Sequence, residues 1–357
     1  MAVKKKPPRS EGPPEAPASD RLVESQASSE DARFDRLFRP QSLDDFVGQA
    51  RHKENLRVYV EAARRRGEPL DHILLCGPPG LGKTTLAGIL AAEMGVSLFT
   101  TSGPAVEHKG VLTGLVTRLG RGDVLFIDEI HRLSAPVEES IYPAIEDFRI
   151  DIMTGDGPYA ESISVDIKPF TLIGATTRTG LLTKPLQERF GVTLRLDFYP
   201  VEDLKLIIQR SARLLGIDCD EAGARALAQR SRGTPRVANR LLRRVRDFAE
   251  VEGKGRIDSA IVELTCARLQ VDSAGLDEMD HKLLRTLIET YDGGPVGVET
   301  LAAALAEPRD TVEDVYEPYL LQQGYLGRTP RGRIATRRAY EHLGIPLGEA
   351  ASQGKLF

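Results

Sequence analysis

Residues 73–85 read Ile-Leu-Leu-Cys-Gly-Pro-Pro-Gly-Leu-Gly-Lys-Thr-Thr, an apolar run followed by a complete phosphate-binding loop. The glycines allow backbone N–H groups to close around phosphates, while Lys83 supplies a positive charge and the Thr84 hydroxyl can bind Mg²⁺. Residues 85–94 then place apolar side chains at helical spacing. The stretch therefore predicts a strand, a loop and a helix that bind ATP and Mg²⁺ through Gly77, Gly80, Gly82, Lys83, Thr84 and Thr85.

A second apolar run, residues 124–127, is followed directly by Asp128 and Glu129. Ligands of open α/β folds bind at the carboxyl edge of the sheet, so both carboxylates are expected beside the phosphate loop. Asp128 is expected to hold the water shell of Mg²⁺, and Glu129 to orient or deprotonate the water that attacks the γ-phosphate. The alternative is an acidic pair at a solvated strand end, and the phosphate loop upstream makes it the weaker interpretation.

Three more polar residues are candidates for the same site. Thr177 follows the apolar run 170–174, and its hydroxyl could contact the γ-phosphate, although threonines that end a strand are also common turn residues. Arg189 stands where a helix is expected to end. It is either an exposed arginine or a finger that reaches the γ-phosphate of a neighbouring subunit. Arg236 begins a later helix and could couple the angle between two domains to the nucleotide state.

The composition is that of an ordinary globular protein, and its 357 residues suffice for two or three domains. A net charge of −4 gives no global indication of nucleic-acid binding, so any such function requires a local basic patch. The 3 cysteines are widely spaced, which favours buried free thiols in a cytoplasmic protein over disulfides or a zinc site. No stretch approaches the roughly 20 apolar residues of a membrane span, so neither export nor membrane insertion is expected.

Residues 34–196 alternate short apolar runs with helix-length segments. This alternation predicts an α/β fold in which helices cover a parallel sheet. The expected strands are residues 73–76, 98–100, 124–127 and 170–174. The chain before residue 34 is rich in Pro, Ser, Glu and Ala, so residues 1–33 are expected to form a disordered tail.

The remainder of the chain predicts two smaller units. Residues 197–272 read as an all-helical lid domain without strands, with helices at 201–215, 221–231, 235–251 and 259–269. Thr234 can cap the third of these helices. Residues 273–345 read as a winged helix-turn-helix, with helices at 280–291, 298–306 and 311–322 and a hairpin that turns at 329–332, before a C-terminal tail at 346–357.

The hairpin carries the local basic patch. Between residues 328 and 338 no acid interrupts the arginines, which are Arg328, Arg331, Arg333, Arg337 and Arg338. Like charges so close repel one another unless a polyanion binds them, and Arg309, ahead of the expected recognition helix, could join them on a phosphate backbone. A solvated basic wing without a partner is the alternative.

Several stretches taken together resemble the RuvB family of bacterial Holliday-junction branch-migration motors. The similarity is carried by residues 77–85, 125–131, 145–152, 170–178, 189–191, 233–236 and 328–336. The phosphate loop and the acidic pair are common to all AAA+ ATPases. The stretch from residue 145 to residue 178, the arginine wing and the order of the three domains are more specific.

The resemblance implies a ring hexamer that encircles duplex DNA and pumps it outward from a four-way junction held by RuvA, using ATP, in recombination, DNA repair and the SOS response. RuvC is implied as a further partner at the junction. By position, the resemblance assigns the adenine pocket to Phe38, Arg39 and Tyr199. It makes Asp128 and Glu129 the Walker B pair, Thr177 sensor 1, Arg189 the finger acting in trans and Arg236 sensor 2.

The resemblance also assigns residues outside the pocket. A segment associated with the nucleotide site at the subunit boundary is matched by Glu146, Asp147 and Phe148, and DNA phosphates would be contacted by Arg309, Arg328 and Arg333. Residues 151–166 resemble the family's RuvA-binding β-hairpin, on which Ile152 and Met153 would offer an apolar surface. Burial of both side chains in the core is the alternative.

Two other functions are alternatives to branch migration. One is a clamp-loader or protein-remodelling AAA+ subunit, whose C-terminal domain would serve assembly and not DNA binding. The other is a non-catalytic nucleotide sensor, which is disfavoured because Lys83, Asp128, Glu129 and Arg189 are all present. The wing arginines distinguish branch migration from the clamp loader, because only the former needs them for duplex binding.

Overall fold

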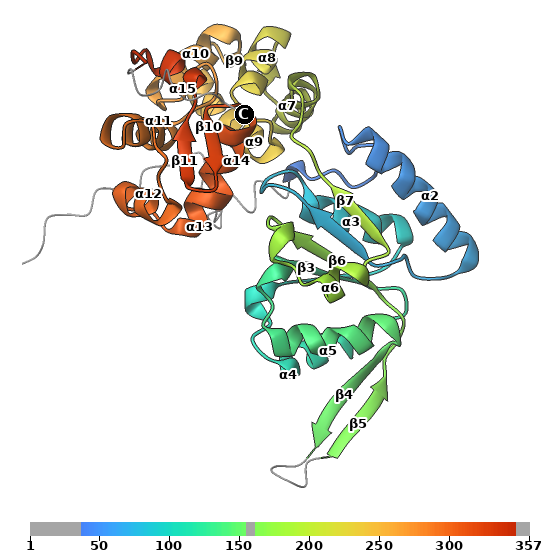
Figure 1. Ribbon diagram of the computed structural model, residues 1–357. Coiled ribbons are helices and arrows are strands. Elements are labelled where there is room, and N and C mark those ends of the chain that lie inside the picture. Colours follow the sequence, from blue (N-terminus) through green and yellow to red (C-terminus); the bar gives the residue numbers. More distant parts are fainter. Residues whose placement is uncertain (1–36, 155–160, 348–357) are drawn as a thin grey trace, which may run out of the picture.

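The computed structural model describes residues 37–154 and 161–347. Figure 1 shows two lobes, one built around a sheet with a projecting hairpin and the other made mostly of helices. The tail expected at residues 1–33 and the turn of the hairpin lie outside the described residues, as does the C-terminal tail from residue 348 onward.

A five-stranded parallel sheet forms the first lobe, which confirms the predicted α/β fold class. The strands lie in the order β2 (Leu98–Ser102), β3 (Val124–Asp128), β6 (Thr171–Thr176), β1 (Ile73–Cys76) and β7 (Val192–Arg195). Register pairs Ser102 with Asp128 and Cys76 with Thr176, so the carboxyl ends of the central strands meet at one edge. The edge strand β7 was not predicted, because its residues alternate between apolar and polar and form no unbroken apolar run like those of the other strands.

Alternate residues of the central strands supply two separate cores. Ile73 and Leu75 face α2 (Ala50–Arg66) and α3 (Lys83–Met94), in a core that continues into the lid domain. Leu74 and Cys76 face α4 (Lys109–Val116) and α5 (Ala135–Glu146) on the other side. Burial on both faces explains why these strands read as unbroken apolar runs in the sequence.

Shorter elements connect the strands of this lobe. They are η1 (Gly103–Ala105), η2 (Ile130–Arg132), η4 (Thr179–Leu181) and α6 (Lys184–Glu188). The hairpin of β4 (Arg149–Thr154) and β5 (Glu161–Asp166) projects away from the sheet lobe in Figure 1.

The lid domain contains the predicted helices, at α7 (Val201–Leu215), α8 (Glu221–Gln229), α9 (Pro235–Val251) and α10 (Ser259–Arg268). The Thr234 hydroxyl accepts a hydrogen bond from the backbone N–H of Val237, as its predicted capping role requires. The expectation of a domain without strands was wrong. Two-residue strands, β8 (Asp218–Cys219) and β9 (Arg256–Ile257), pair in parallel and are too short to show a period of two in the sequence.

The winged-helix domain begins with α11 (Glu278–Arg285), which continues into η5 (Thr286–Thr290), and α12 (Val298–Leu305). A continuous helical stretch follows, made of α13 (Arg309–Thr311), η6 (Val312–Tyr316) and α14 (Glu317–Gln322). The predicted hairpin is present as β10 (Leu326–Thr329) and β11 (Gly332–Ala335). A last helix, α15 (Arg337–Leu343), follows the wing and was not predicted.

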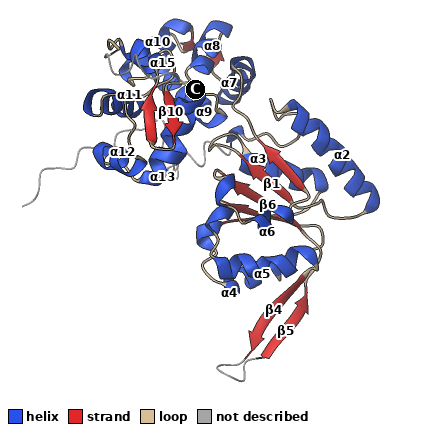
Figure 2. Ribbon diagram, in the orientation of Figure 1, coloured by secondary structure: helices blue, strands red, loops and turns tan. Residues whose placement is uncertain are grey.

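A buried ion pair joins the lid to the winged-helix domain. Arg232 donates to Asp280 over 2.6 Å, and both side chains are almost fully buried. Burial raises the pKa of Asp280 to about 7, and the charge of Arg232 opposes that rise. Arg232 also lies 4.8 Å from the ring centroid of Tyr319. Removal of either charge would leave the other buried and unpaired, so the two domains are held together as one lobe (Figure 2).

Candidate functional site

A cavity of about 610 Å³ opens at the carboxyl edge of the sheet, where all three domains contribute residues. The structure brings most of the predicted nucleotide residues together there. The predicted residues that line the cavity are Phe38, Arg39, Gly80, Gly82, Lys83, Thr84, Thr85, Asp128, Glu129, Thr177, Tyr199 and Arg236.

The phosphate loop places Lys83 at the base of this cavity. Its side chain is largely buried, and its Nζ donates to the carbonyl oxygens of Gly77, over 2.7 Å, and of Pro78, over 2.9 Å. Burial lowers the pKa of Lys83 to about 8, and the negative charges of Asp128 and Glu129 oppose that shift. Burial makes the charged form of Lys83 costly, and a bound phosphate would stabilise that charged form.

Two loop glycines are required by the backbone. Gly80 and Gly82 have φ values of +84° and +96°, in the region that other residues rarely adopt. A Cβ on Gly80 would also lie 3.0 Å from the Cβ of Arg236. The close approach therefore places the first turn of α9 from the lid directly against the loop.

The acidic pair lies where β3 ends. An Asp128 oxygen accepts a hydrogen bond from the backbone N–H of Glu129 over 3.0 Å, and Glu129 itself has a left-handed backbone with φ +51°. Burial raises the pKa of Glu129, and the neighbouring charge of Asp128 raises it further. A carboxylate with a raised pKa is a stronger base, which suits the activation of a water molecule.

His131 is a neighbour that sequence reasoning missed. One ring nitrogen lies 3.4 Å from a carboxylate oxygen of Glu129, and the other lies 2.9 Å from the Thr176 hydroxyl at the end of β6. Burial lowers the pKa of this imidazole, so it faces Glu129 as a neutral ring near pH 7. Its place two residues after Glu129 was visible in the sequence, but nothing there indicated that the ring turns back onto the carboxylate.

The Thr177 hydroxyl provides a test of whether a nucleotide fits. Its oxygen is buried and has no hydrogen-bond partner within the described residues, although Thr177 lines the cavity. A buried hydroxyl without a partner is costly, and a phosphate oxygen or an ordered water in the cavity would satisfy it. The cationic loop, the acidic pair and this hydroxyl together form a donor and acceptor set that fits a triphosphate with a divalent cation.

Apolar and aromatic side chains form the other end of the cavity. Phe38 and Tyr199 are buried there beside Ile207, and the Tyr199 hydroxyl donates to the Leu81 carbonyl over 3.3 Å. Arg210 fixes the backbone at Phe38 by donating to its carbonyl over 2.7 Å. This end suits the flat apolar faces of a nucleobase.

Arg189 lies outside the cavity of its own chain. Its guanidinium stacks 4.0 Å above the Tyr142 ring, and its Nε lies 3.1 Å from a carboxylate oxygen of Glu146. Asp147 and Phe148, like Glu146, do not line the cavity, and Phe148 instead packs against the rings of His72 and Phe170. The predicted boundary residues thus gather at α5 and α6, away from the pocket of the same protomer.

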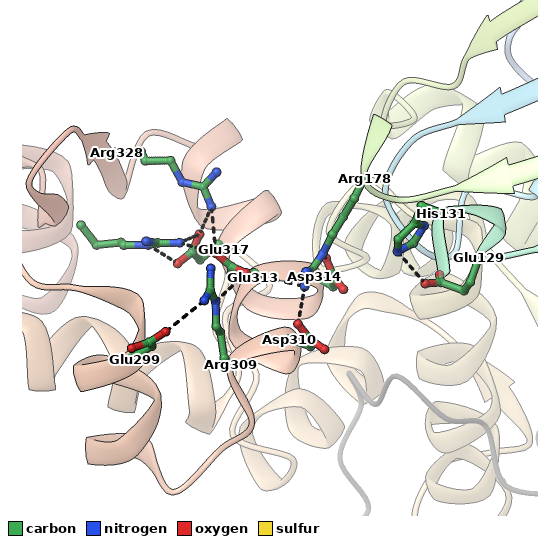
Figure 3. Close-up of polar contacts among 11 residues, drawn as sticks. Glu129, His131, Arg178, Glu299, Arg309, Asp310, Glu313, Asp314, Glu317 and Arg328 are labelled. Carbon is green, nitrogen blue, oxygen red and sulfur yellow. Dashed lines mark hydrogen bonds and ion pairs between the residues drawn. The ribbon is translucent and has the colours of Figure 1, made fainter. Parts of the chain in front are cut away.

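The wing arginines are partnered by acids from outside the wing. Glu317 on α14 is fully buried and accepts from Arg328 over 2.7 Å and from Arg333 over 2.6 Å. Arg309 lies 3.0 Å from Glu299 and 3.2 Å from Glu313 (Figure 3). The expectation that the wing arginines repel one another unless a polyanion binds them was therefore wrong for Arg328 and Arg333. The exposed fractions of Arg309 and Arg328 are 53% each, against 11% for Arg333, so Arg333 is the least accessible to DNA.

Residues of the projecting hairpin are only partly described. Ile152 is half-buried and packs at the edge of the α4 and α5 core, opposite Ile163 on β5. The side chain of Met153 and the turn at 155–160 lie outside the described residues. Ile163 is 49% exposed, so the described part of the hairpin does present apolar surface.

The remaining predictions from composition concern thiols and membranes. All three cysteines are free, with Cys76 and Cys266 buried and Cys219 half-buried. Burial raises the pKa of Cys266 to about 11, so this thiol is unreactive near neutral pH. Within residues 37–154 and 161–347, no helix is long and apolar enough to cross a membrane.

A phosphate loop, an acidic pair on the neighbouring strand and a helical lid that closes on the loop define an ATPase of the AAA+ class. The models of three RuvB domains match successive parts of the chain: the Holliday junction DNA helicase RuvB P-loop domain at residues 38–196, the RuvB AAA lid domain at 199–272 and the RuvB C-terminal winged helix domain at 273–344. The chain belongs to the RuvB family.

Solved structures give the same result. The Thermotoga maritima RuvB Holliday junction branch migration motor is 53% identical, with a TM-score of 0.82, over 87% of this chain and 100% of that chain. A mutant of the same protein is 54% identical with a TM-score of 0.82, over 87% of this chain and 99% of that chain. The described fold, with its lid and winged-helix domain, is therefore that of RuvB.

The pKa of Lys83 predicts proton uptake on ATP binding in weakly alkaline solution. Without nucleotide, the Lys83 side chain is partly neutral at a pH above its pKa of about 8, and bound phosphates would restore its positive charge. At about pH 8.5, calorimetry in buffers of different ionisation enthalpy is expected to detect uptake of a fraction of a proton. The Lys83→Ala variant should lose this uptake. Equal uptake by the variant and the wild type would contradict the assignment.

Proposed function

We infer that this chain is the ATP-driven motor that promotes branch migration of Holliday junctions together with RuvA. The observation that carries this function is the single cavity in which a phosphate loop, an acidic pair and the winged-helix domain meet. An ATPase centre placed between a lid and a DNA-binding domain can convert hydrolysis into movement of that domain.

Different residues of the cavity would contact different parts of the nucleotide. Phe38, Arg39 and Tyr199 would hold the adenine, while Lys83, Thr85 and Arg236 would hold the phosphates. Thr84 and Asp128 would hold Mg²⁺, which supplies charge neutralisation at the β and γ oxygens when bound. Glu129 would take the proton of the attacking water, and the Thr177 hydroxyl would orient that water.

The position of Arg189 supports a ring in which each protomer serves the next, and the RuvB resemblance makes that ring a hexamer. An arginine that stacks on Tyr142 and pairs with Glu146, outside its own cavity, is placed to serve the γ-phosphate of the next protomer. Glu146, Asp147 and Phe148 would then lie at the boundary between protomers. A head-to-tail interface of this kind forms a ring when the rotation between neighbouring protomers closes.

Two surfaces would meet the macromolecular partners. Arg309 and Arg328 are half-exposed on the winged-helix domain and would contact duplex phosphates, while Arg333 would hold the wing against Glu317. The projecting hairpin, through Ile152 and Met153, would contact RuvA. RuvC would join as a further partner at the same junction.

The function is tested by dissociation of a four-way DNA junction. The full chain with RuvA, ATP and Mg²⁺ is expected to convert the junction into two duplexes, and omission of RuvA at low protein concentration or of ATP should prevent it. Failure on four-way DNA under every condition, with ATP hydrolysis intact, would favour a clamp-loader or protein-remodelling subunit.

The wing gives a specific prediction for this assay. Each phosphate contact that is lost lowers the dependence of duplex affinity on salt by about one unit of slope. The Arg328→Gln variant is therefore expected to bind duplex DNA about tenfold more weakly, with a flatter salt dependence and unchanged ATP affinity. Fluorescence anisotropy with labelled duplex at several salt concentrations measures this. The matched variant Arg213→Gln, at an exposed position near the end of helix α7 in the lid, should bind as the wild type does.

A further inference from the structure

Arg178 is a cation of the nucleotide cavity to which the proposed function gives no role. It directly follows Thr177 at the end of β6, and its side chain is 22% exposed. Its Nε donates to Asp314 over 2.6 Å, and a terminal nitrogen donates to Asp310 over 3.0 Å. Both acids belong to the winged-helix domain, as Figure 3 shows, so these contacts form a clamp between that domain and the ATPase domain.

The acids of the clamp lie inside the nucleotide cavity. Asp310 and Asp314 line it together with Lys83 and Glu129. The carboxylate of Asp314 therefore shares one cavity with Asp128 and Glu129 of the hydrolytic centre. A triphosphate would bring further negative charge into the same space, so it and Asp314 would repel one another.

Phosphate and carboxylate compete for the same kind of partner. A guanidinium presents a rigid fork of donors that matches either group. Arg178 already donates from two of its nitrogens, and the hydrogen bond to Asp314 is the main reason that its pKa is raised. A phosphate that entered the cavity could therefore replace the acids without any change in the chemistry of the arginine.

The helical segment that carries Asp310 and Asp314 is also attached to the wing, through acids further along it. Glu317, three residues after Asp314, is fully buried and pairs with Arg333 over 2.6 Å. Glu313 lies 2.9 Å from Arg333 and 3.7 Å from Arg178, and so belongs to both networks. Movement of Asp310 and Asp314 away from Arg178 would consequently move the wing as well.

We propose that Arg178 is a phosphate-responsive positioning residue, which holds the winged-helix domain through Asp310 and Asp314 and transfers to the triphosphate when ATP binds. The proposal rests on the proposed function, because it takes the cavity to be an ATP site. Binding of ATP then releases the winged-helix domain, and the position of that domain sets the affinity for ATP in return.

Two variants with opposite expected effects test this. Asp310→Asn combined with Asp314→Asn removes the competing charges while keeping the shape of the side chains. The full chain carrying both changes is expected to bind a non-hydrolysable ATP analogue with Mg²⁺ about tenfold more tightly than the wild type. Arg178→Gln removes the cation and leaves the acids facing the phosphates, so it should bind the analogue about tenfold more weakly.

Titration calorimetry gives the affinities, and circular dichroism verifies that each variant is folded. Glu341→Gln breaks an exposed ion pair with Arg337 elsewhere in the winged-helix domain and should leave the affinity within about twofold of the wild type. A clamp with a purely structural role would shift both test variants in the same direction or in neither, and either result overturns the proposal. If the wild type binds no analogue, the proposed function fails as well. If the analogue binds but its affinity does not depend on Asp310 and Asp314, only the proposed clamp is rejected.

Discussion

Replacement of Arg189 by alanine is expected to lower the rate of ATP hydrolysis by about 10³-fold or more, while each protomer still binds ATP. The guanidinium lies outside its own cavity and is held against Tyr142 and Glu146, so its loss leaves the pocket of the same chain intact. What is lost is stabilisation of charge on the transferring phosphoryl group of the neighbouring protomer. A phosphate-release assay measures the rate, and calorimetry measures the affinity.

The control for this variant is Arg213→Ala. Arg213 is an exposed arginine of α7 that donates to the Gln209 carbonyl and has no place near the cavity. It should hydrolyse ATP at the wild-type rate. Wild-type turnover by the Arg189→Ala chain would exclude the finger role, and loss of ATP binding by that chain would show that Arg189 supports its own pocket.

Replacement of Glu129 by glutamine is the second change with a large expected effect. Glutamine keeps the size of the side chain but cannot accept a proton from the attacking water, so hydrolysis is expected to fall by about 10²–10⁴-fold. Binding of ATP should be retained or strengthened, because one negative charge leaves a cavity that also contains Asp128 and Asp314. Single-turnover hydrolysis separates the chemical step from binding.

The pH dependence provides a second measurement on the same residue. Burial and Asp128 raise the pKa of Glu129, and the base must be ionised to act, so hydrolysis should decline as the pH falls toward that pKa. The Glu139→Gln variant, at an exposed position of α5, should keep both the rate and the pH profile. Unchanged turnover in Glu129→Gln would reject the general-base role.

The parts of the fold that could be predicted are those with a local signal. The strand β1 and the loop after it are a continuous pattern, and the caps and lengths of the lid helices follow from residues such as Thr234 and Pro235. The strand β7 was missed because it has no unbroken apolar run, although Gly191 precedes it and its residues alternate between apolar and polar.

In the candidate site, too, the residues with a local sequence signal could be predicted and the contacts without one could not. Lys83, Asp128 and Thr177 could be placed in one site because parallel strands deliver their carboxyl ends to one edge. The contact between Arg178 and Asp314 joins residues 136 positions apart, and no pattern in either segment indicates that they meet. The acids that neutralise the wing were missed for a related reason, since Glu313 and Glu317 lie on a helix before the wing and not within it.

Mixing two inactive chains tests the shared active site most directly. Lys83→Ala disables the pocket but keeps the finger, and Arg189→Ala disables the finger but keeps the pocket. In rings that assemble at random from equal amounts, about one site in four combines an intact pocket with an intact finger. Hydrolysis in the mixture is therefore expected to recover to about a quarter of the wild-type rate. If native mass spectrometry shows mixed rings and the mixture hydrolyses no more ATP than either chain alone, the active site is not shared between protomers.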